Sequence, residues 1–79
     1  MATKRVKLTF PPHLIKEPVL FSMANKYDVM PNIRRARVTE SVGEIILELE
    51  GDEGNLETGI QSLIDQGITV ELIEGEFIE

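Results

Sequence analysis

The sequence predicts an α+β fold of the ferredoxin-like type, in which two helices cover one face of a four-stranded antiparallel sheet. Three observations lead to this prediction. The chain has 79 residues, enough for one domain with a small core. Four segments alternate between polar and apolar residues, and two stretches with apolar residues at helical spacing lie between them. Their order is strand–helix–strand–strand–helix–strand, and right-handed crossovers place both helices on one face.

The first predicted strand and helix occupy residues 5–10 and 18–27. Apolar side chains alternate along the strand on the face expected to be buried: Val6, Leu8 and Phe10. Pro18 suits the first helical turn, where its missing N–H is not needed. The helix carries one apolar stripe: Leu20, Met23, Ala24 and Tyr27. Phe21 lies off this stripe, which leaves open whether it is a solvent-facing outlier or part of a contact.

The second and third predicted strands, residues 32–39 and 44–50, form a hairpin whose short connection ends on Gly43. Strict alternation assigns three residues of the second strand to the core face: Arg34, Ala36 and Val38. The residues between them are assigned to the open face: Ile33, Arg35 and Arg37. The third strand is expected to direct its apolar side chains inward: Ile45, Leu47 and Leu49.

The second predicted helix starts after Asp52, a candidate N-cap, and ends at Gly67, which suits a left-handed C-cap. Its apolar stripe has the spacing of a half-buried helix: Leu56, Ile60, Leu63 and Ile64. The fourth strand follows over residues 68–73. Its inward side chains are expected to complete the core: Ile68, Val70 and Leu72.

One domain is expected over residues 1–79, with a core at about 5–74 and a tail at 75–79. Fourteen acidic against eight basic residues give a net charge of −6, which disfavours non-specific binding to nucleic acid or anionic membrane. No apolar run approaches the roughly 18 residues of a membrane-spanning helix, and we expect no signal peptide. Without cysteine there is no disulfide, thiolate zinc site or iron–sulfur cluster. We expect a cytoplasmic protein without cofactor or metal.

No motif predicts catalysis. His13 is the only histidine, and it lies in a proline-rich connection without a carboxylate or serine at a suitable spacing, so we expect an exposed loop residue. Residues 52–55 have some of the composition of a cation-binding loop but lack its twelve-residue pattern, which favours a helix cap. Phosphate-binding glycine loops, nucleophile elbows and zinc patterns are absent from the sequence. We therefore expect a non-catalytic module.

The open face of the predicted sheet is expected to carry charges that alternate in sign from strand to strand. In the spatial order fourth, first, third, second, the outward residues are acidic, basic, acidic and basic. Opposite charges across a ladder contribute about 0.2–1 kcal/mol per pair. RNA-binding sheets of this topology carry aromatic residues on their central strands. The corresponding positions on the central strands of this sequence hold Lys7, Thr9, Ile46 and Glu48, and none of these is aromatic. We therefore predict a salt-bridged surface and no nucleic-acid binding.

A series of short motifs, spread from about residue 6 to residue 72, resembles the NIL domain family. The matching positions are Leu8-Thr9-Phe10, Pro18, Asn32-Ile33, Gly43, Glu48-Leu49, Gly51 and Gly67-Ile68-x-Val70-Glu71. The resemblance implies a ferredoxin-like regulatory domain. In one branch this domain lies at the C-terminus of the ATPases of methionine-uptake ABC transporters, where it binds methionine and inhibits transport. In a second branch it precedes an iron–sulfur ferredoxin domain in proteins linked to sulfur assimilation.

The name motif of the family, Asn-Ile-Leu, reads Asn32-Ile33-Arg34 in this chain. The resemblance therefore implies that Asn32 and Ile33 are candidate ligand-contact positions. Arg34 replaces the leucine on the face assigned to the core, where an unpaired guanidinium would be costly. We expect Arg34 to extend from the strand end toward water, or to hold the carboxylate of a ligand with its fork of donors. The run from Asn32 to Ala36 resembles the second branch more, although no cysteine is present for its clusters, which leaves a stand-alone NIL domain or a piece of a larger protein.

Two functional hypotheses remain. In the first, a regulatory module senses methionine or a related sulfur amino acid, bound between the copies of a homodimer. The second predicted strand is an edge that can pair with another copy, unless its three arginines prevent this. In the second hypothesis, the domain docks on a ferredoxin, a sulfur-assimilation enzyme or a transporter and has no ligand. The acidic composition and the apolar pair Phe77-Ile78 favour docking.

Overall fold

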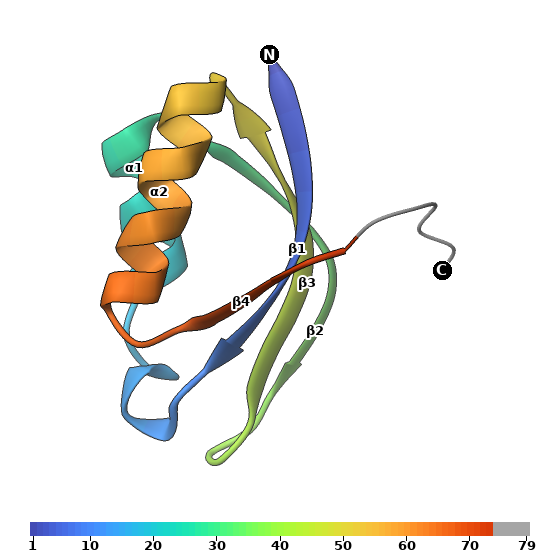
Figure 1. Cartoon of the computed structure of the whole chain (residues 1–79). Helices are drawn as coiled ribbons and strands as arrows, with labels where there is room; N and C mark the ends of the chain where they lie inside the picture. The colour runs from blue at the N-terminus through green and yellow to red at the C-terminus, as the bar shows by residue number, and fades with distance from the viewer. Residues whose placement is uncertain (74–79) are drawn as a thin grey trace.

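The computed structural model describes residues 1–73 and confirms the predicted α+β fold. Two helices cover one face of a four-stranded antiparallel sheet, and the other face is open (Figure 1). The spatial order β2-β3-β1-β4 is the predicted one. The elements are β1 (Ala2–Phe10), the short 3-10 helix η1 (Pro12–Leu14), α1 (Val19–Tyr27), β2 (Met30–Val38), β3 (Gly43–Gly51), α2 (Glu53–Asp65) and β4 (Thr69–Leu72). The expected tail with Phe77 and Ile78 lies outside the described residues.

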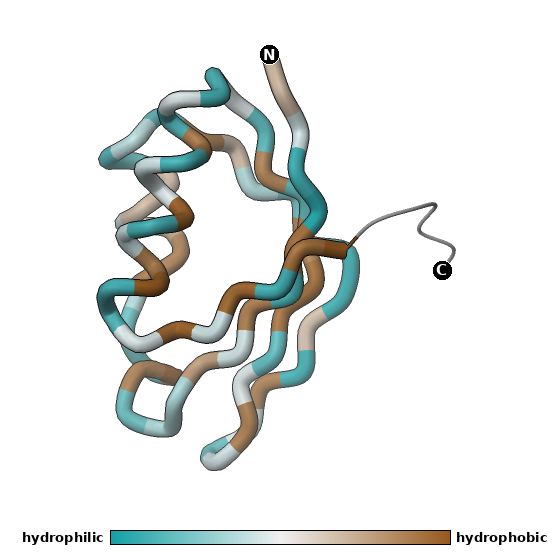
Figure 2. The backbone as a smooth tube through the Cα atoms, in the orientation of Figure 1, coloured by the Kyte–Doolittle hydropathy of each residue, from teal (hydrophilic) through white to brown (hydrophobic). Residues whose placement is uncertain are grey.

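The core lies between the helices and the sheet. Hydrophobic residues alternate with hydrophilic ones along the strands, as Figure 2 shows, so one face of the sheet is apolar. The largest side chains with almost no exposed surface come from β1, β3 and α2: Val6, Leu8, Leu47, Leu49, Leu56 and Leu63. The predicted stripe of α1 packs on them, with Leu20, Met23 and Ala24 buried.

The two helices approach each other closely at Gly59. A Cβ atom at Gly59 would lie 2.8 Å from Sδ of Met23, so the absence of a side chain lets α2 pack against α1. The sequence predicted Ile64 and Leu72 as core residues, but they are 45% and 63% exposed. Both predictions are wrong because periodicity reports the face of an element and not how far a neighbouring element extends over that face.

The predicted helix boundaries are found, with different local chemistry. Gly67 follows α2 with a φ of +101°, a conformation that only glycine adopts without strain. Asp52 occupies the N-cap position, yet its side chain makes no capping hydrogen bond. Helix α1 ends at Tyr27, and the C-cap residue Asp28 has a φ of +56°. His13 is exposed within η1, as expected for a residue of the connection.

A β-bulge in β2 changes the predicted faces of this strand. Ile33 lies opposite Leu47 of β3, and Arg35 lies opposite Ile46, so Arg34 is an extra residue between two aligned pairs. One extra residue inverts the alternation. The assignments of Ile33 to the open face and of Arg34 to the core face are therefore wrong. From Arg35 onward the predicted faces agree with the register.

Candidate functional site

The bulge separates the three residues that the sequence singled out as ligand contacts. Ile33 shares the helix-covered face with its register partner Leu47, which is completely buried. Asn32 lies opposite Glu48 and shares the open face with it. Arg34 contacts the same Glu48 on the open face. The three residues therefore do not surround one site, and only Ile33 lies on the side of the helices.

Arg34 is held in an ion pair with Glu48. Its Nη2 and Nε atoms donate to Oε1 of Glu48 at 2.9 and 3.2 Å, while Nε of Arg5 donates to Oε2 at 2.8 Å. These hydrogen bonds, from Arg5 first and Arg34 second, hold the pKa of Glu48 below its usual range. A further pair joins Lys7 to Glu44 at 3.4 Å. The predicted salt-bridged open face is confirmed for these residues, with Arg34 as an unexpected member.

An apolar pocket of about 300 Å³ lies beside Ile33. Its walls come from the end of β1, the connection after η1, the start of α1 and the β2–β3 hairpin. Two charged residues from the connection, Lys16 and Glu17, also line it. The remaining lining residues are Phe10, Ile15, Pro18, Leu20, Phe21, Ile33, Val38, Gly43 and Ile45.

A side chain at Gly43, one of the lining residues, would crowd two other residues of the pocket wall. A Cβ atom at Gly43 would lie 3.0 Å from Cγ1 of Ile15 and 3.1 Å from Cβ of Phe10. The cavity therefore depends on glycine at the start of β3. Apolar walls of this kind accept an aliphatic or thioether side chain, and the ammonium of Lys16 and the carboxylate of Glu17 have the charges that complement a free amino acid.

Sequence reasoning missed most residues of the pocket. Lys16 and Glu17 lie in a connection, where no periodicity singles out any position. Phe21 did give a signal, because it lies off the stripe of α1, and the structure resolves that question. It is 63% exposed and forms part of the pocket wall.

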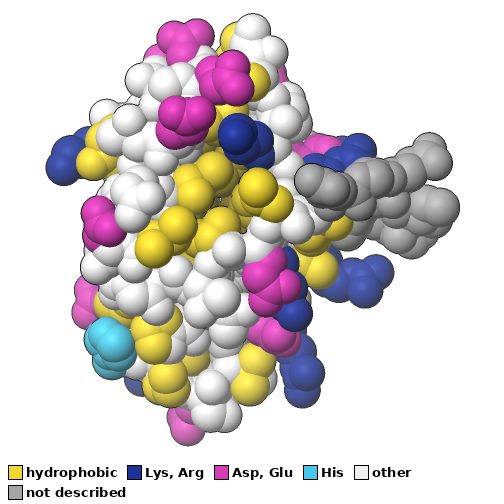
Figure 3. Space-filling view, viewed as in Figure 1, with side chains coloured by type: hydrophobic (Ala, Val, Ile, Leu, Met, Phe, Trp, Pro, Cys, Tyr) yellow, Lys and Arg dark blue, Asp and Glu magenta, His cyan; other side chains and the backbone are white. Residues whose placement is uncertain are grey.

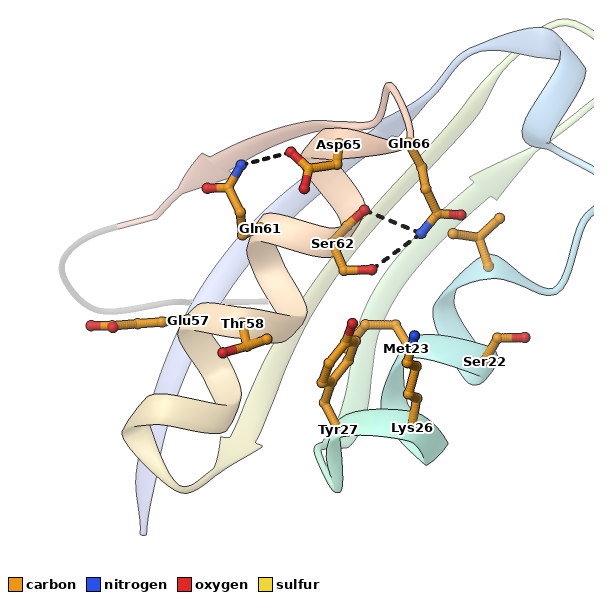
Figure 4. Close-up of a pocket in the computed structure, with 11 residues that line it drawn as sticks. Ser22, Met23, Lys26, Tyr27, Glu57, Thr58, Gln61, Ser62, Asp65 and Gln66 are labelled. Carbon is orange, nitrogen blue, oxygen red and sulfur yellow. Dashed lines mark hydrogen bonds between the residues drawn. The ribbon is translucent and has the colours of Figure 1, made fainter.

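A second, larger depression of about 790 Å³ lies between α1 and α2, and most of the residues that line it are polar (Figure 4). Nζ of Lys26 lies 5.4 Å from the ring centroid of Tyr27. Along α2, Nε2 of Gln61 donates to Asp65 at 2.9 Å, and Nε2 of Gln66 donates to the carbonyl of Ser62 at 3.1 Å. Four of the lining side chains therefore already bond to one another along α2 and its C-cap, which leaves these groups less available to a ligand.

Within residues 1–73, no three His, Cys, Asp or Glu side chains gather where they could hold a metal ion. No helix in this range is long and apolar enough to cross a membrane.

The family model of the NIL domain matches residues 4–72. The chain belongs to the NIL domain family. A solved structure, described as the C-terminal domain of an ABC transporter ATP-binding protein from Enterococcus faecalis, is similar to this NIL domain with a TM-score of 0.78 and 26% sequence identity. The similarity covers 92% of this chain and 86% of that chain. No curated protein matches the sequence.

Several motif positions of this NIL domain meet at the apolar pocket. Phe10, Pro18, Ile33 and Gly43 belong to the short motifs of the sequence that resemble the family, and all four line the cavity. They come from four separate segments of the chain, which only the fold brings together. The pocket is therefore the best candidate for the functional site of this NIL domain.

Proposed function

We propose that this NIL domain is a non-catalytic regulatory module that binds methionine, or a related amino acid with an apolar side chain, in the pocket beside Ile33. One observation carries the proposal: a cavity of about 300 Å³ with apolar walls is lined at the same time by Lys16 and Glu17. An amino acid presents an apolar side chain together with one carboxylate and one ammonium group. The pocket offers a complement to each of the three.

The walls determine which side chains bind best. Each buried methylene contributes about 0.8 kcal/mol, so a thioether side chain is favoured over that of alanine. Apolar walls discriminate poorly between side chains of similar size, by about 1–3 kcal/mol per methylene. We therefore expect methionine and homocysteine to bind more tightly than alanine, and leucine to compete with methionine.

The surroundings of the pocket suggest how occupancy is transmitted. Ile33 and Val38 are 44% and 58% exposed, and with Phe21 they form an apolar surface beside the cavity. Exposed apolar patches of this kind mark contact surfaces. We propose that a second copy of the domain covers this surface and that the bound amino acid strengthens the dimer. By this route the domain would regulate a transporter, as the similarity to a domain of an ABC transporter ATP-binding protein suggests, or an enzyme of sulfur metabolism.

The same exposed surface supports a second candidate function. In that candidate, the apolar surface of Phe21, Ile33 and Val38 docks directly on a partner protein, and no small ligand is involved.

Either function fits a cytoplasmic location, which the absence of cysteine favours because small exported domains usually contain disulfides.

Isothermal titration calorimetry with L-methionine and L-homocysteine tests the proposal. We expect saturable binding to the natural chain and a loss of binding in Ile33→Gln. The matched control is Ile64→Gln, because Ile64 is 45% exposed, nearly as much as Ile33, and lies on α2 outside the pocket. Asn32→Ala is expected to bind normally, since Asn32 lies on the other face. No heat at millimolar ligand with a folded domain would contradict the proposal and favour docking.

A further inference from the structure

The exposed edge of the sheet carries two arginines on its open face. Arg35 and Arg37 are two residues apart on β2, so their side chains project from the same face about 6.8 Å apart. Their register partners on β3 are Ile46 and Glu44. Figure 3 shows Lys and Arg side chains on the side of the molecule where Figure 1 places the open face.

The acids of β3 are already engaged by other residues. Glu48 accepts hydrogen bonds from Arg5 and Arg34, and Glu44 pairs with Lys7 at 3.4 Å. Across residues 1–73, neither Arg35 nor Arg37 has an ion-pair partner. Although the chain has a net charge of −6, the part that the structure describes presents two guanidinium groups side by side on one strand without a carboxylate partner.

The backbone of β2 is also open to a partner. This strand is at the edge of the sheet, and every residue of it except Pro31 is exposed. An edge strand has a row of N–H and C=O groups that can pair with an added strand. Natural edges are commonly protected by charge, and an antiparallel pairing of β2 with β2 of a second copy would bring the arginines of both copies together. The arginine charges therefore disfavour pairing of β2 with β2 of a second copy, and they favour pairing of β2 with a strand that carries acidic side chains.

We propose that β2 docks an extended acidic segment of a partner protein as a fifth strand. Carboxylates at alternate positions of that segment have the same spacing as Arg35 and Arg37 and lie on the same face. Each guanidinium then donates charge-assisted hydrogen bonds to one carboxylate, while the main chains of β2 and of the added segment pair as neighbouring strands. The side chains of Arg35 and Arg37 lie on the opposite face of the sheet from the pocket beside Ile33, so the proposal goes beyond amino-acid binding and does not depend on it.

Fluorescence anisotropy with a labelled peptide tests this proposal. The probe is a peptide of alternating Glu and Thr residues, as long as β2, and its control has Gln in place of Glu. We expect the Glu peptide to bind and the Gln peptide not to bind. The double variant Arg35→Gln/Arg37→Gln is expected to weaken binding about a hundredfold, as loss of two charge-assisted hydrogen bonds predicts. The matched control is Lys4→Gln/Lys26→Gln, which removes the same charge elsewhere and is expected to bind the peptide normally.

Four outcomes would overturn the proposal. The first is the absence of peptide binding to the folded domain at millimolar concentration. The second is binding of the Glu peptide with equal affinity by Arg35→Gln/Arg37→Gln and Lys4→Gln/Lys26→Gln. The third is self-association in sedimentation velocity that Arg35→Gln/Arg37→Gln abolishes and the peptide does not displace, which would assign the edge to a second copy. The fourth is tighter binding of single-stranded RNA than of the Glu peptide. Methionine calorimetry on Arg35→Gln/Arg37→Gln is expected to be unchanged, so failure of this proposal and failure of amino-acid binding are distinguishable.

Discussion

Arg34 and Glu48 form a contact that connects the bulge of β2 to the neighbouring strand β3. Two guanidinium nitrogens of Arg34 donate to Oε1 of Glu48, at 2.9 and 3.2 Å. The second carboxylate oxygen accepts from Arg5 on β1, so one side chain links three strands. Because the bulge places Arg34 on the open face, its charge is paired at the surface and the core remains apolar.

This contact predicts a pH dependence of stability. The pKa of Glu48 in the folded chain is lower than its ordinary value because Arg5 and Arg34 donate hydrogen bonds to the carboxylate. A lowered pKa stabilises the fold above the ordinary pKa of Glu, and this contribution is lost as the pH falls through the folded value. We expect Glu48→Gln to melt at a lower temperature than the natural chain at pH 7. The difference is expected to shrink at acidic pH.

Melting curves followed by circular dichroism at a series of pH values measure this effect. The control is Glu50→Gln, because Glu50 is exposed on the same strand and has no ion pair within the described residues. A pH-independent difference between the natural chain and Glu48→Gln would show that the ion pairs of Glu48 do not stabilise the fold.

The core predicts a large difference between two leucines that point to the same face of the sheet. Leu47 has no exposed surface, whereas Leu72 is mostly exposed at the edge strand β4. We expect Leu47→Ala to lower the free energy of unfolding by about 2–5 kcal/mol, because it leaves a cavity. Leu72→Ala is expected to change it by less than about 1 kcal/mol. Urea denaturation of both variants gives the two values, and similar losses would contradict the packing described.

The close approach of the helices at Gly59 predicts an exception to helix propensity. Replacing glycine by alanine inside an exposed helix contributes up to about 1 kcal/mol. Nothing lies within 4 Å of a Cβ atom at Gly54, so we expect Gly54→Ala to stabilise the domain. At Gly59 the new Cβ atom would displace Sδ of Met23, 2.8 Å away, and we expect no gain or a loss. Urea denaturation compares the free energies of unfolding of Gly54→Ala and Gly59→Ala. An equal increase in both would show that α1 and α2 are further apart at Gly59 than the structure places them.

The charge on Lys16 predicts how the proposed ligand is oriented. If the ammonium of Lys16 binds the carboxylate of methionine, Lys16→Gln is expected to weaken binding about tenfold, the effect of losing one charge-assisted hydrogen bond. Methionine amide lacks this carboxylate, so we expect it to bind the natural chain and Lys16→Gln with the same affinity. Calorimetry with both compounds tests the pairing. A loss of affinity for both ligands alike would mean that Lys16 acts on the pocket walls and not on the carboxylate.

Much of the fold was predictable because it depends on patterns between near neighbours in the chain. Alternation marked the four strands, and apolar spacing marked both helices. Gly67 was identified because a left-handed residue after a helix favours glycine. The right-handedness of the two crossovers, a property of any chain of L-residues, placed both helices on one face, and the strand order is the usual one of the ferredoxin-like fold.

The bulge and the pocket required the tertiary structure. Alternation cannot reveal that Arg34 is an extra residue, because a bulge exists only in the pairing of β2 with β3. That one residue exchanged the faces of Ile33 and Arg34 and separated the expected ligand contacts. The pocket brings together Phe10, Phe21 and Ile33 from segments far apart in the chain. Local periodicity assigns a residue to a face of its own element, whereas a cavity depends on which elements the packing brings together.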